Sequence, residues 1–485
     1  MGNIISEFRK SLNLFDATSI VAGSMIGSGI FIVSADIARS LGSPGWLLIV
    51  WVLTGVLTII AALSYGELAS MMPHAGGQYV YIREAYNPLS GFLFGWTLFM
   101  VIQTGSIAAV GMAFAKFTGV LFPWFSESNV WFELGRIKIT TVHALAIFSI
   151  LFLSWLNAQG IRLGKIVQNS FTITKILSLI GLIVVGLFFA KSTGAIELNS
   201  KVFWDAVQVK DGNLIPLTGF ALIAAIGTAM VGALFSADAW NSATFTAGET
   251  INPKRNVPLS LLFGTGIVIV LYILANIVYL QALPLRGAPD GTTVFERGIQ
   301  YATNDRVGTA AMFGFFGSYA AMIMAVLVVI STFGCNNGMI LSASRVYYAM
   351  ANDGLFFKKV GKLNSKGVPS NGLLFQGIWA SLLCLSGTYS DLLDYVIFAV
   401  LIFYTMTIIG IYILRKKRPD AERPYKAFGY PVVPAIYIIM ATLIMIDLLI
   451  YKPNYTWPGL IIVLLGIPVY YIWRHLEKKN ETKIQ

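Results

Sequence analysis

Charged side chains are scarce in this sequence. Asp, Glu, Lys and Arg make up 12% of the 485 residues, and 56% of the residues are hydrophobic, whereas a soluble globular protein carries about 25% charged residues. Most of the surface must therefore face something other than water. Apolar runs of about 20 residues, the length that crosses a bilayer as a helix, recur along the chain. The composition excludes a soluble protein and predicts an all-α integral membrane protein.

Cysteine and histidine are also rare. The two cysteines, Cys335 and Cys384, lie within apolar runs, so nothing indicates a disulfide framework. The three histidines are far apart, and no metal-ligand spacing joins them to the cysteines. There is no Gly-rich phosphate loop followed by Lys-Ser or Lys-Thr, so ATP is not the expected energy source. We expect no metal, no cofactor and no enzymatic activity.

The excess of positive charge fits a membrane topology. We count twelve apolar spans between Leu14 and Trp473. With a cytoplasmic N-terminus, 22 of the 34 Lys and Arg residues fall on the cytoplasmic side, as the positive-inside rule requires. The net charge of +11 therefore indicates contact with anionic membrane lipid and not with nucleic acid. We expect a multi-pass protein of the inner (cytoplasmic) cell membrane with both termini in the cytoplasm.

The first and sixth spans, Leu14–Ala38 and Leu217–Ala247, are interrupted. The first contains "GSMIGSGIF" and the sixth "GALFSADAWNSATF". Irregular backbone at membrane depth persists only where it lines a cavity, because each unsatisfied group costs several kcal/mol. A broken helix offers N–H groups for a carboxylate and carbonyls for an ammonium. Close helix packing through small residues is the alternative explanation for the first motif.

The spacing of the two breaks favours a transporter. They lie five spans apart, and an odd repeat unit places its second copy upside down in the membrane. Discontinuous helices at matching positions of inverted repeats mark the binding site of secondary transporters. The sequence therefore predicts that a small zwitterion binds between the first and sixth spans.

Several longer motifs carry a family resemblance. They are "IGSGIF" at Ile26–Phe31, "SYGELASMMPHAGGQYVYIREAY" at Ser64–Tyr86, "VQNSFTITK" at Val167–Lys175, "INPKRNVP" at Ile251–Pro258 and "RKKRPDAERPYKAFGYPVVP" at Arg415–Pro434. In these motifs the chain resembles the amino acid–polyamine–organocation superfamily, most closely its L-type amino acid transporter branch. The likeness covers nearly the whole chain, with the motifs in the family's order.

The resemblance implies a leucine-transporter-like fold. Twelve transmembrane helices would form a five-plus-five inverted repeat, with helices 1 and 6 discontinuous. The first repeat would cover residues 1–190 and the second 191–429, and residues 430–485 would hold helices 11 and 12 and the cytoplasmic tail. The implied function is sodium-independent transport of amino acids by alternating access, through exchange or proton coupling.

The resemblance also assigns roles to residues of the two breaks. It implies that Gly27, Ser28 and Gly29 of the first break hold the substrate carboxylate. The carbonyls of Met25, Phe235 and Asp238 would receive the substrate ammonium. The Phe235 ring would lie over the substrate, and Trp240 and Asn241 would shape the pocket. From its own chemistry, Asp238 could cap the second half of span 6 or place a carboxylate beside a cationic substrate.

Lys175 is predicted to lie near the middle of the membrane. It follows the cytoplasmic Lys165 by ten residues, or about 15 Å of helix, and a lysine there costs about 2.5–3.5 kcal/mol. The resemblance implies that its ammonium replaces a bound sodium ion and bridges span 1 to Ser331 or Thr332. Two other readings are a coupled proton carried by Lys175 and a side chain that snorkels to the interface.

Two further expectations concern partners and alternatives. Eukaryotic members of the branch pair with a single-span glycoprotein through a cysteine after span 3, but Pro123–Lys138 has no cysteine. We therefore expect no disulfide-linked glycoprotein partner. The alternative functions are polyamine or organic-cation antiport, for which Asp238 is the only clear acidic residue, and amino-acid sensing without transport.

Overall fold

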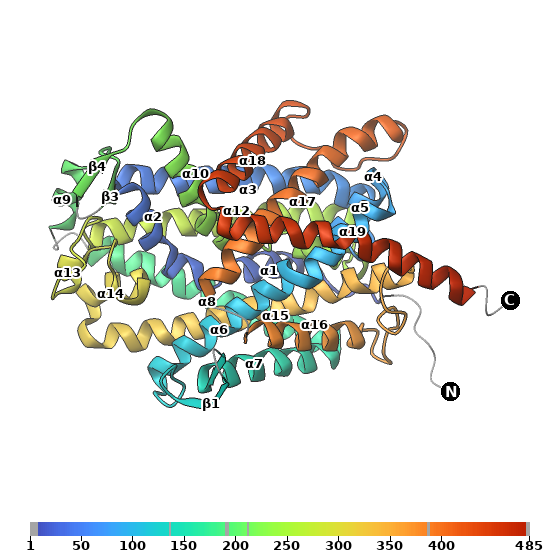
Figure 1. The fold of residues 1–485 in the computed structure, drawn as a ribbon, viewed down its shortest axis with the longest axis horizontal. Helices are drawn as coiled ribbons and strands as arrows, with labels where there is room; N and C mark the ends of the chain where they lie inside the picture. The colour runs from blue at the N-terminus through green and yellow to red at the C-terminus, as the bar shows by residue number, and fades with distance from the viewer. Residues whose placement is uncertain (1–7, 135–136, 190–193, 211–212, 386–388, 482–485) are drawn as a thin grey trace.

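The computed structural model describes residues 8–134, 137–189, 194–210, 213–385 and 389–481 and consists of long, roughly aligned helices (Figure 1). Ten helical segments of this described part are long and apolar enough to cross a membrane. They are formed by α3 (Pro44–Met71), α5 (Pro88–Thr97) continuing through η2 (Leu98–Ile102) into α6 (Gln103–Leu121), α7 (Thr141–Ala158), α8 (Ile161–Phe189), α10 (Gly219–Ser236), α12 (Pro253–Ala282), α14 (Val307–Phe316) continuing through η6 (Gly317–Tyr319) into α15 (Ala320–Asn352), α17 (Tyr389–Lys417), α18 (Val432–Tyr451) and α19 (Pro453–Glu481). The helical membrane architecture agrees with the sequence.

Two further helices at predicted spans are shorter than a full span, and the first of them is apolar. They are α1 (Leu14–Met25) and α16 (Ser370–Leu383), with 12 and 14 residues. Both lie where the sequence places a span, so the count of twelve stays a prediction. The remaining helices are short: α2 (Val33–Leu41) and α11 (Ser242–Phe245) follow α1 and α10, and α4 (Gln78–Ala85), α9 (Ala195–Lys201) and α13 (Val294–Arg297) lie in connections between the spans.

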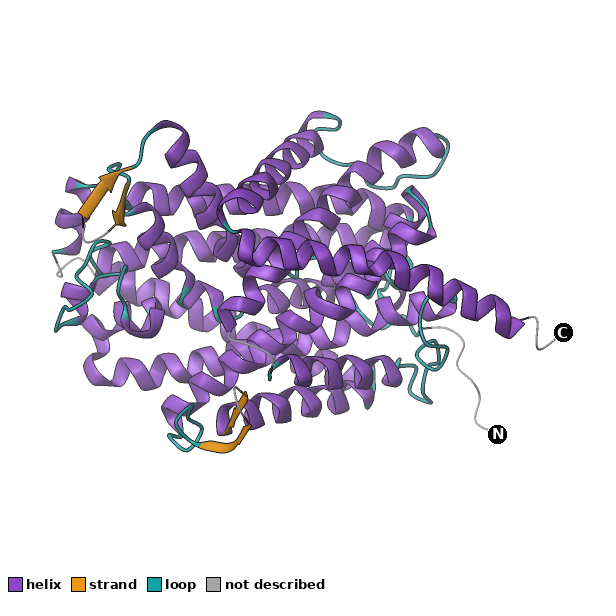
Figure 2. Cartoon of the chain, in the orientation of Figure 1, coloured by secondary structure: helices purple, strands orange, loops and turns teal. Residues whose placement is uncertain are grey.

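The all-α expectation misses two small hairpins. In the described part of the chain, strands occur only as β1 (Val130–Leu134) with β2 (Ile137–Thr140) and β3 (Val207–Lys210) with β4 (Asn213–Pro216), each pair antiparallel (Figure 2). Both hairpins lie in connections between spans. Their β-branched and aromatic residues favour extended backbone but are too few to stand out beside the long apolar runs.

Both predicted helix breaks are present. Helix α1 ends at Met25, and a short 3₁₀ turn, η1 (Gly29–Phe31), precedes α2. Helix α10 ends at Ser236, and α11 begins at Ser242, followed by η4 (Ala247–Glu249). In each case the chain continues in the same span after several non-helical residues, so the breaks lie inside the bundle.

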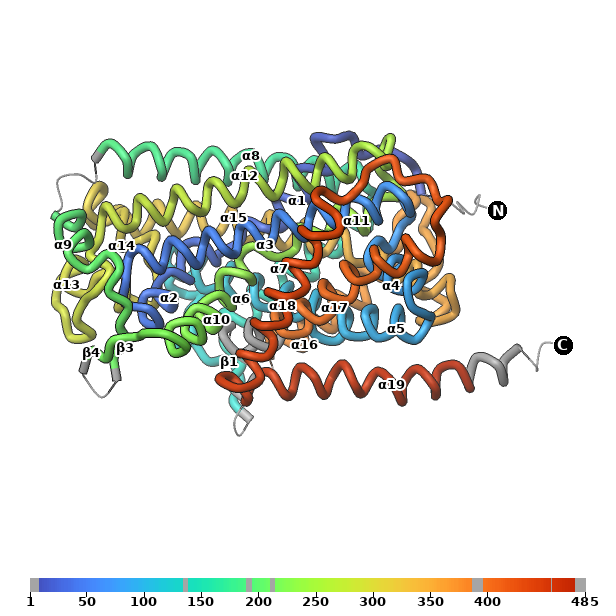
Figure 3. The backbone as a smooth tube through the Cα atoms, turned by 90° about the horizontal axis from the view of Figure 1, so that it is seen from above, coloured from blue at the N-terminus to red at the C-terminus, as the bar shows by residue number. Residues whose placement is uncertain are grey.

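Neighbouring spans hold the first broken helix in the interior. Helices α8 and α12 pack against α1 and against each other, and α12 runs along α3 (Figure 3). Gly264 of α12 lies so close to Val21 of α1 that an added Cβ would be 2.5 Å from the valine side chain. The last helix, α19, lies at the edge of the bundle and contacts α5 and α17.

The two ends of the bundle differ in chemistry. The two longest connections, with α9, β3, β4 and α13, gather at one end, opposite the end of α19 (Figure 1). At the end near α19, the buried Glu67 carboxylate accepts hydrogen bonds from Arg415 at 2.7 and 2.9 Å and from the Ala427 N–H at 2.7 Å, with Arg423 at 3.4 Å. The long motif after the tenth predicted span is therefore folded onto α3.

Candidate binding site between the two helix breaks

The two breaks face a common cavity. Its volume is about 30 Å³, and it is lined by residues of both breaks and by side chains of α6 and α15. Six of the eight residues that the sequence assigns to substrate line it: Met25, Gly27, Ser28, Gly29, Phe235 and Asp238. Residues 210 positions apart in the sequence are thus brought together.

The first break presents main-chain donors. Among the described residues, the N–H groups of Gly27 and Gly29 have no backbone acceptor. A Cβ on Gly29 would lie 2.1 Å from Ser236 Oγ, so only glycine allows this approach of the two breaks. Unpaired N–H groups beside a helix start form an anion site.

A tyrosine that sequence reasoning missed ties the two breaks together. The Tyr272 hydroxyl of α12 lies 3.0 Å from the Met25 carbonyl and 3.1 Å from the Ser236 carbonyl. These are the last residues of α1 and α10, whose carbonyls have no continuing helix to pair with. A single tyrosine in an apolar run gives no sequence signal of such a role.

Asp238 lies at the centre of the second break. Its Oδ1 accepts a hydrogen bond of 2.5 Å from the Tyr404 hydroxyl of α17. The N-cap residue of α11 is Asn241, so Asp238 does not cap that helix. Asp238 also lines two smaller cavities beside the main one, of about 20 and 10 Å³.

Trp240 and Asn241 lie just outside the main cavity. The buried Trp240 ring packs 4.7 Å from Tyr65 and 5.0 Å from Tyr404 and lines the 20 Å³ cavity. The Asn241 amide donates to Gln78 Oε1 at 2.8 Å, which fastens the second break to α4. Gln78 was not singled out by sequence reasoning.

Lys175 of α8 reaches the first break. Its Nζ donates to the carbonyls of Gly23, Ile26 (2.8 Å) and Ser331 (3.4 Å), and the residue is only 2% exposed. The side chain therefore does not snorkel to the interface. Ser331 Oγ also donates to the carbonyls of Ile26 and Gly27, each at 3.0 Å. The Thr332 hydroxyl instead bonds within its own helix, to Val328 O at 2.7 Å.

Comparison with known proteins identifies the family. The family described as "Amino acid permease" matches residues 12–470. The chain belongs to the amino acid permease family. This permease is 29% identical over 467 residues to the b(0,+)-type amino acid transporter 1 of Mus musculus, covering 96% of this chain and 88% of that protein. It is 30% identical over 478 residues to the large neutral amino acids transporter small subunit 2 of Rattus norvegicus, covering 97% and 82%. The resemblance to the L-type branch is confirmed.

The comparisons overturn one expectation. We predicted no disulfide-linked glycoprotein partner because Pro123–Lys138 lacks a cysteine, and that prediction is wrong. The large neutral amino acids transporter relatives are named as small subunits, which makes them components of a larger assembly. A missing cysteine removes one means of attachment and does not remove a partner.

Proposed function

We propose that this permease moves amino acids across the cytoplasmic membrane as a sodium-independent secondary transporter. Alternating access would expose the cavity between the breaks first to one side and then to the other, driven by exchange or by proton coupling. The observation that best supports this proposal is that both broken helices end at one cavity. Twelve spans in a five-plus-five inverted repeat, with both termini cytoplasmic, complete the proposal.

The substrate carboxylate is proposed to bind the first break. The N–H groups of Gly27 and Gly29, with the Ser28 hydroxyl nearby, lie at the N-terminal end of the outer half-helix, where a negative charge is favoured. The substrate ammonium would face the carbonyls of Met25, Phe235 and Asp238, and the Asp238 carboxylate would favour a cationic substrate side chain. Both charged ends are then held by groups of the two breaks.

Aromatic and apolar groups complete the proposed pocket. Phe235 lines the cavity and, like Leu234 beside it in α10, is only partly buried. Val110 and Met339 line the same space and suit an apolar substrate side chain. Since the rat relative is named for large neutral amino acids, we propose these as the first substrate class to test.

Lys175 supports sodium independence. Its ammonium occupies the space between the end of α1 and α15 and donates to three carbonyls. A cation that binds there would meet a fixed positive charge and no free carbonyl. We propose that Lys175 holds the first break in place of a bound sodium ion, and that it also carries the proton if transport is proton-coupled.

The topology of the proposal rests on charge and on the two bundle ends. The connections that carry α9 and α13, predicted outside, lie together at the end opposite to the end of α19 (Figure 1). This arrangement agrees with cytoplasmic termini. Protease treatment of intact cells should leave epitope tags at both termini uncut, and cleavage of either tag would contradict the topology.

The test of transport is counterflow in sodium-free proteoliposomes. Liposomes that contain the purified chain and unlabelled L-leucine should accumulate external labelled L-leucine by exchange. If transport is coupled to protons, liposomes without internal amino acid should accumulate it only when a proton gradient is applied. Gly29→Ala should abolish the flux, because its methyl group collides with Ser236. Gly181→Ala is the matched control, since an added Cβ there meets nothing within 4 Å. Absence of flux with any amino acid, or a strict need for sodium, would contradict the proposal.

A further inference from the structure

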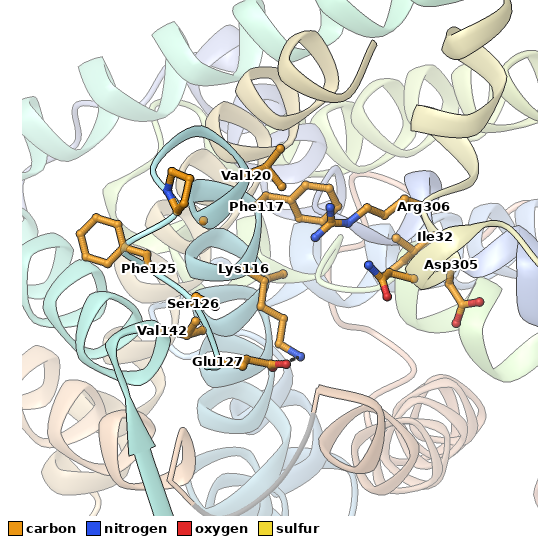
Figure 4. Close-up of a pocket in the computed structure, with 14 residues that line it drawn as sticks. Ile32, Lys116, Phe117, Val120, Phe125, Ser126, Glu127, Val142, Asp305 and Arg306 are labelled. Carbon is orange, nitrogen blue, oxygen red and sulfur yellow. Dashed lines mark ion pairs between the residues drawn. The ribbon is translucent and has the colours of Figure 1, made fainter. Parts of the chain in front are cut away.

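A second and larger cavity lies toward the end of the bundle that carries α13 and β3–β4. Its volume is about 560 Å³, and it is lined by the end of α6, the connection that follows it, and residues 304–306 just before α14 (Figure 4). Ile32, the residue between η1 and α2, forms part of its wall. The large cavity therefore begins one turn beyond the break that is proposed to bind substrate.

The lining of this cavity holds two cations, Lys116 and Arg306, and two carboxylates, Glu127 and Asp305. Lys116 forms an ion pair of 2.8 Å with Glu127, and Asp305 is paired with Arg39 at 2.6 Å. Among the described residues, Arg306 has no carboxylate within ion-pair distance. Its guanidinium lies 4.8 Å from the centre of the Phe117 ring, against one wall of the cavity (Figure 4). Both carboxylates of the described lining are thus paired with other cations, and the Arg306 guanidinium is in no ion pair.

The surroundings of Arg306 suit the binding of a carboxylate. The side chain is partly buried and held in place by the aromatic ring, and burial lowers its pKa with no carboxylate to oppose the effect. A guanidinium fixed in this way presents a planar pair of donors, the geometry that pairs with a carboxylate through two hydrogen bonds. The cavity volume lies in the range of small-molecule sites.

We propose that this cavity is a second binding site for an α-amino acid, whose carboxylate pairs with the Arg306 guanidinium. The ammonium of the same molecule faces Glu127, and its side chain lies against Phe117 and Phe125, which also line the cavity. The inference rests on the proposed function: the site holds an amino acid at the outer mouth before it passes Ile32 to the helix breaks. A zwitterion fits better than a simple anion because the Glu127 carboxylate, although paired with Lys116, also lines the cavity that Arg306 borders.

The first test compares the two membrane faces. Intact cells that express the full chain report the KM for external labelled L-leucine, and inverted vesicles from the same cells report the KM for the internal face. Arg306→Gln should raise the external KM roughly tenfold, as expected for one lost charge-assisted pair, and leave the internal KM unchanged. Lys138→Gln, which removes an exposed cation outside the cavity, is the control. An unchanged external KM, or an equal rise on both faces, would overturn the inference.

The second test counts bound molecules. Equilibrium dialysis of the purified chain should find two labelled L-leucine molecules per chain at saturation, and one for Arg306→Gln. One molecule in the wild-type chain, with leucine transport intact, overturns the second site and leaves the proposed function standing. If the wild-type chain neither transports nor binds any amino acid, the proposed function fails and this inference fails with it.

Discussion

Replacing Lys175 by methionine separates the role of the lysine in transport from its role in stability. Methionine keeps much of the length of the side chain and removes the ammonium. In the structure the ammonium donates to the carbonyls of Gly23, Ile26 and Ser331. The Ile26 carbonyl keeps the Ser331 hydroxyl, and Ser331 O lies within the continuous helix α15. Only Gly23 O, near the end of α1, loses its partner altogether.

The two free-energy terms of this change nearly cancel for folding. An orphaned buried carbonyl costs about 1–3 kcal/mol, whereas removing an ammonium from the middle of the membrane recovers about 2.5–3.5 kcal/mol. The stability of Lys175→Met should therefore stay near that of the wild type. Transport has no such compensation, because the lost bond is the one that holds the first break in place. A loss of 1–3 kcal/mol there lowers the exchange rate roughly 5- to 150-fold.

The assay measures both quantities on the same purified protein. Leucine counterflow gives the exchange rate, and thermal unfolding followed by tryptophan fluorescence gives the stability. Leu177→Met, on the same helix and 61% exposed, is the control and should change neither. If Lys175 also carries the coupled proton, the methionine variant will lose any dependence on a pH gradient. Wild-type exchange by Lys175→Met would refute the bridging role and the proton role together.

Three other substitutions test neighbouring parts of the account. Asp238→Asn should lower uptake of arginine and lysine at least several-fold relative to leucine, and an unchanged ratio in competition assays would exclude its carboxylate from the substrate site. Ala239→Gly should stabilise the chain by about 0.5–1 kcal/mol in thermal unfolding, because Ala239 has φ +65° and glycine relieves that strain; a lower stability would contradict this reading. Glu249→Gln should destabilise the chain by about 3–5 kcal/mol, because it leaves Arg345 as a buried unpaired charge. Arg345 is 1% exposed and binds Glu249 at 2.8 and 2.9 Å. The double variant with Arg345→Met should recover much of the lost stability.

The sequence was sufficient for features that follow from local chemistry. Hydropathy predicts the spans, and the small and polar residues of "GSMIGSGIF" and "FSADAWNS" predict where the first and sixth helices break. Both predictions rest on a strong local rule, that unpaired backbone is not tolerated in lipid. The cost of a charge at membrane depth favoured partners for Lys175 inside the bundle, although the sequence also left a snorkelling side chain open.

The contacts that complete the site could not be predicted in this way. Tyr272 and Tyr404 are single tyrosines in long apolar helices, and only the packing of α12 and α17 brings their hydroxyls to the breaks. The Arg306 cavity depends on three segments distant in the sequence meeting at one end of the bundle. The error about a partner subunit has another origin. It rested on one missing cysteine, and a partner can also bind without a disulfide.

The most direct test of the central claim is an experimental structure of the chain with L-leucine bound. We expect density for the amino acid between the two breaks, with its carboxylate about 3 Å from the N–H groups of Gly27 and Gly29 and its ammonium toward the carbonyls of Met25 and Asp238. Leucine bound elsewhere while the space between the breaks stays empty, or first and sixth helices that run unbroken, would contradict the central claim.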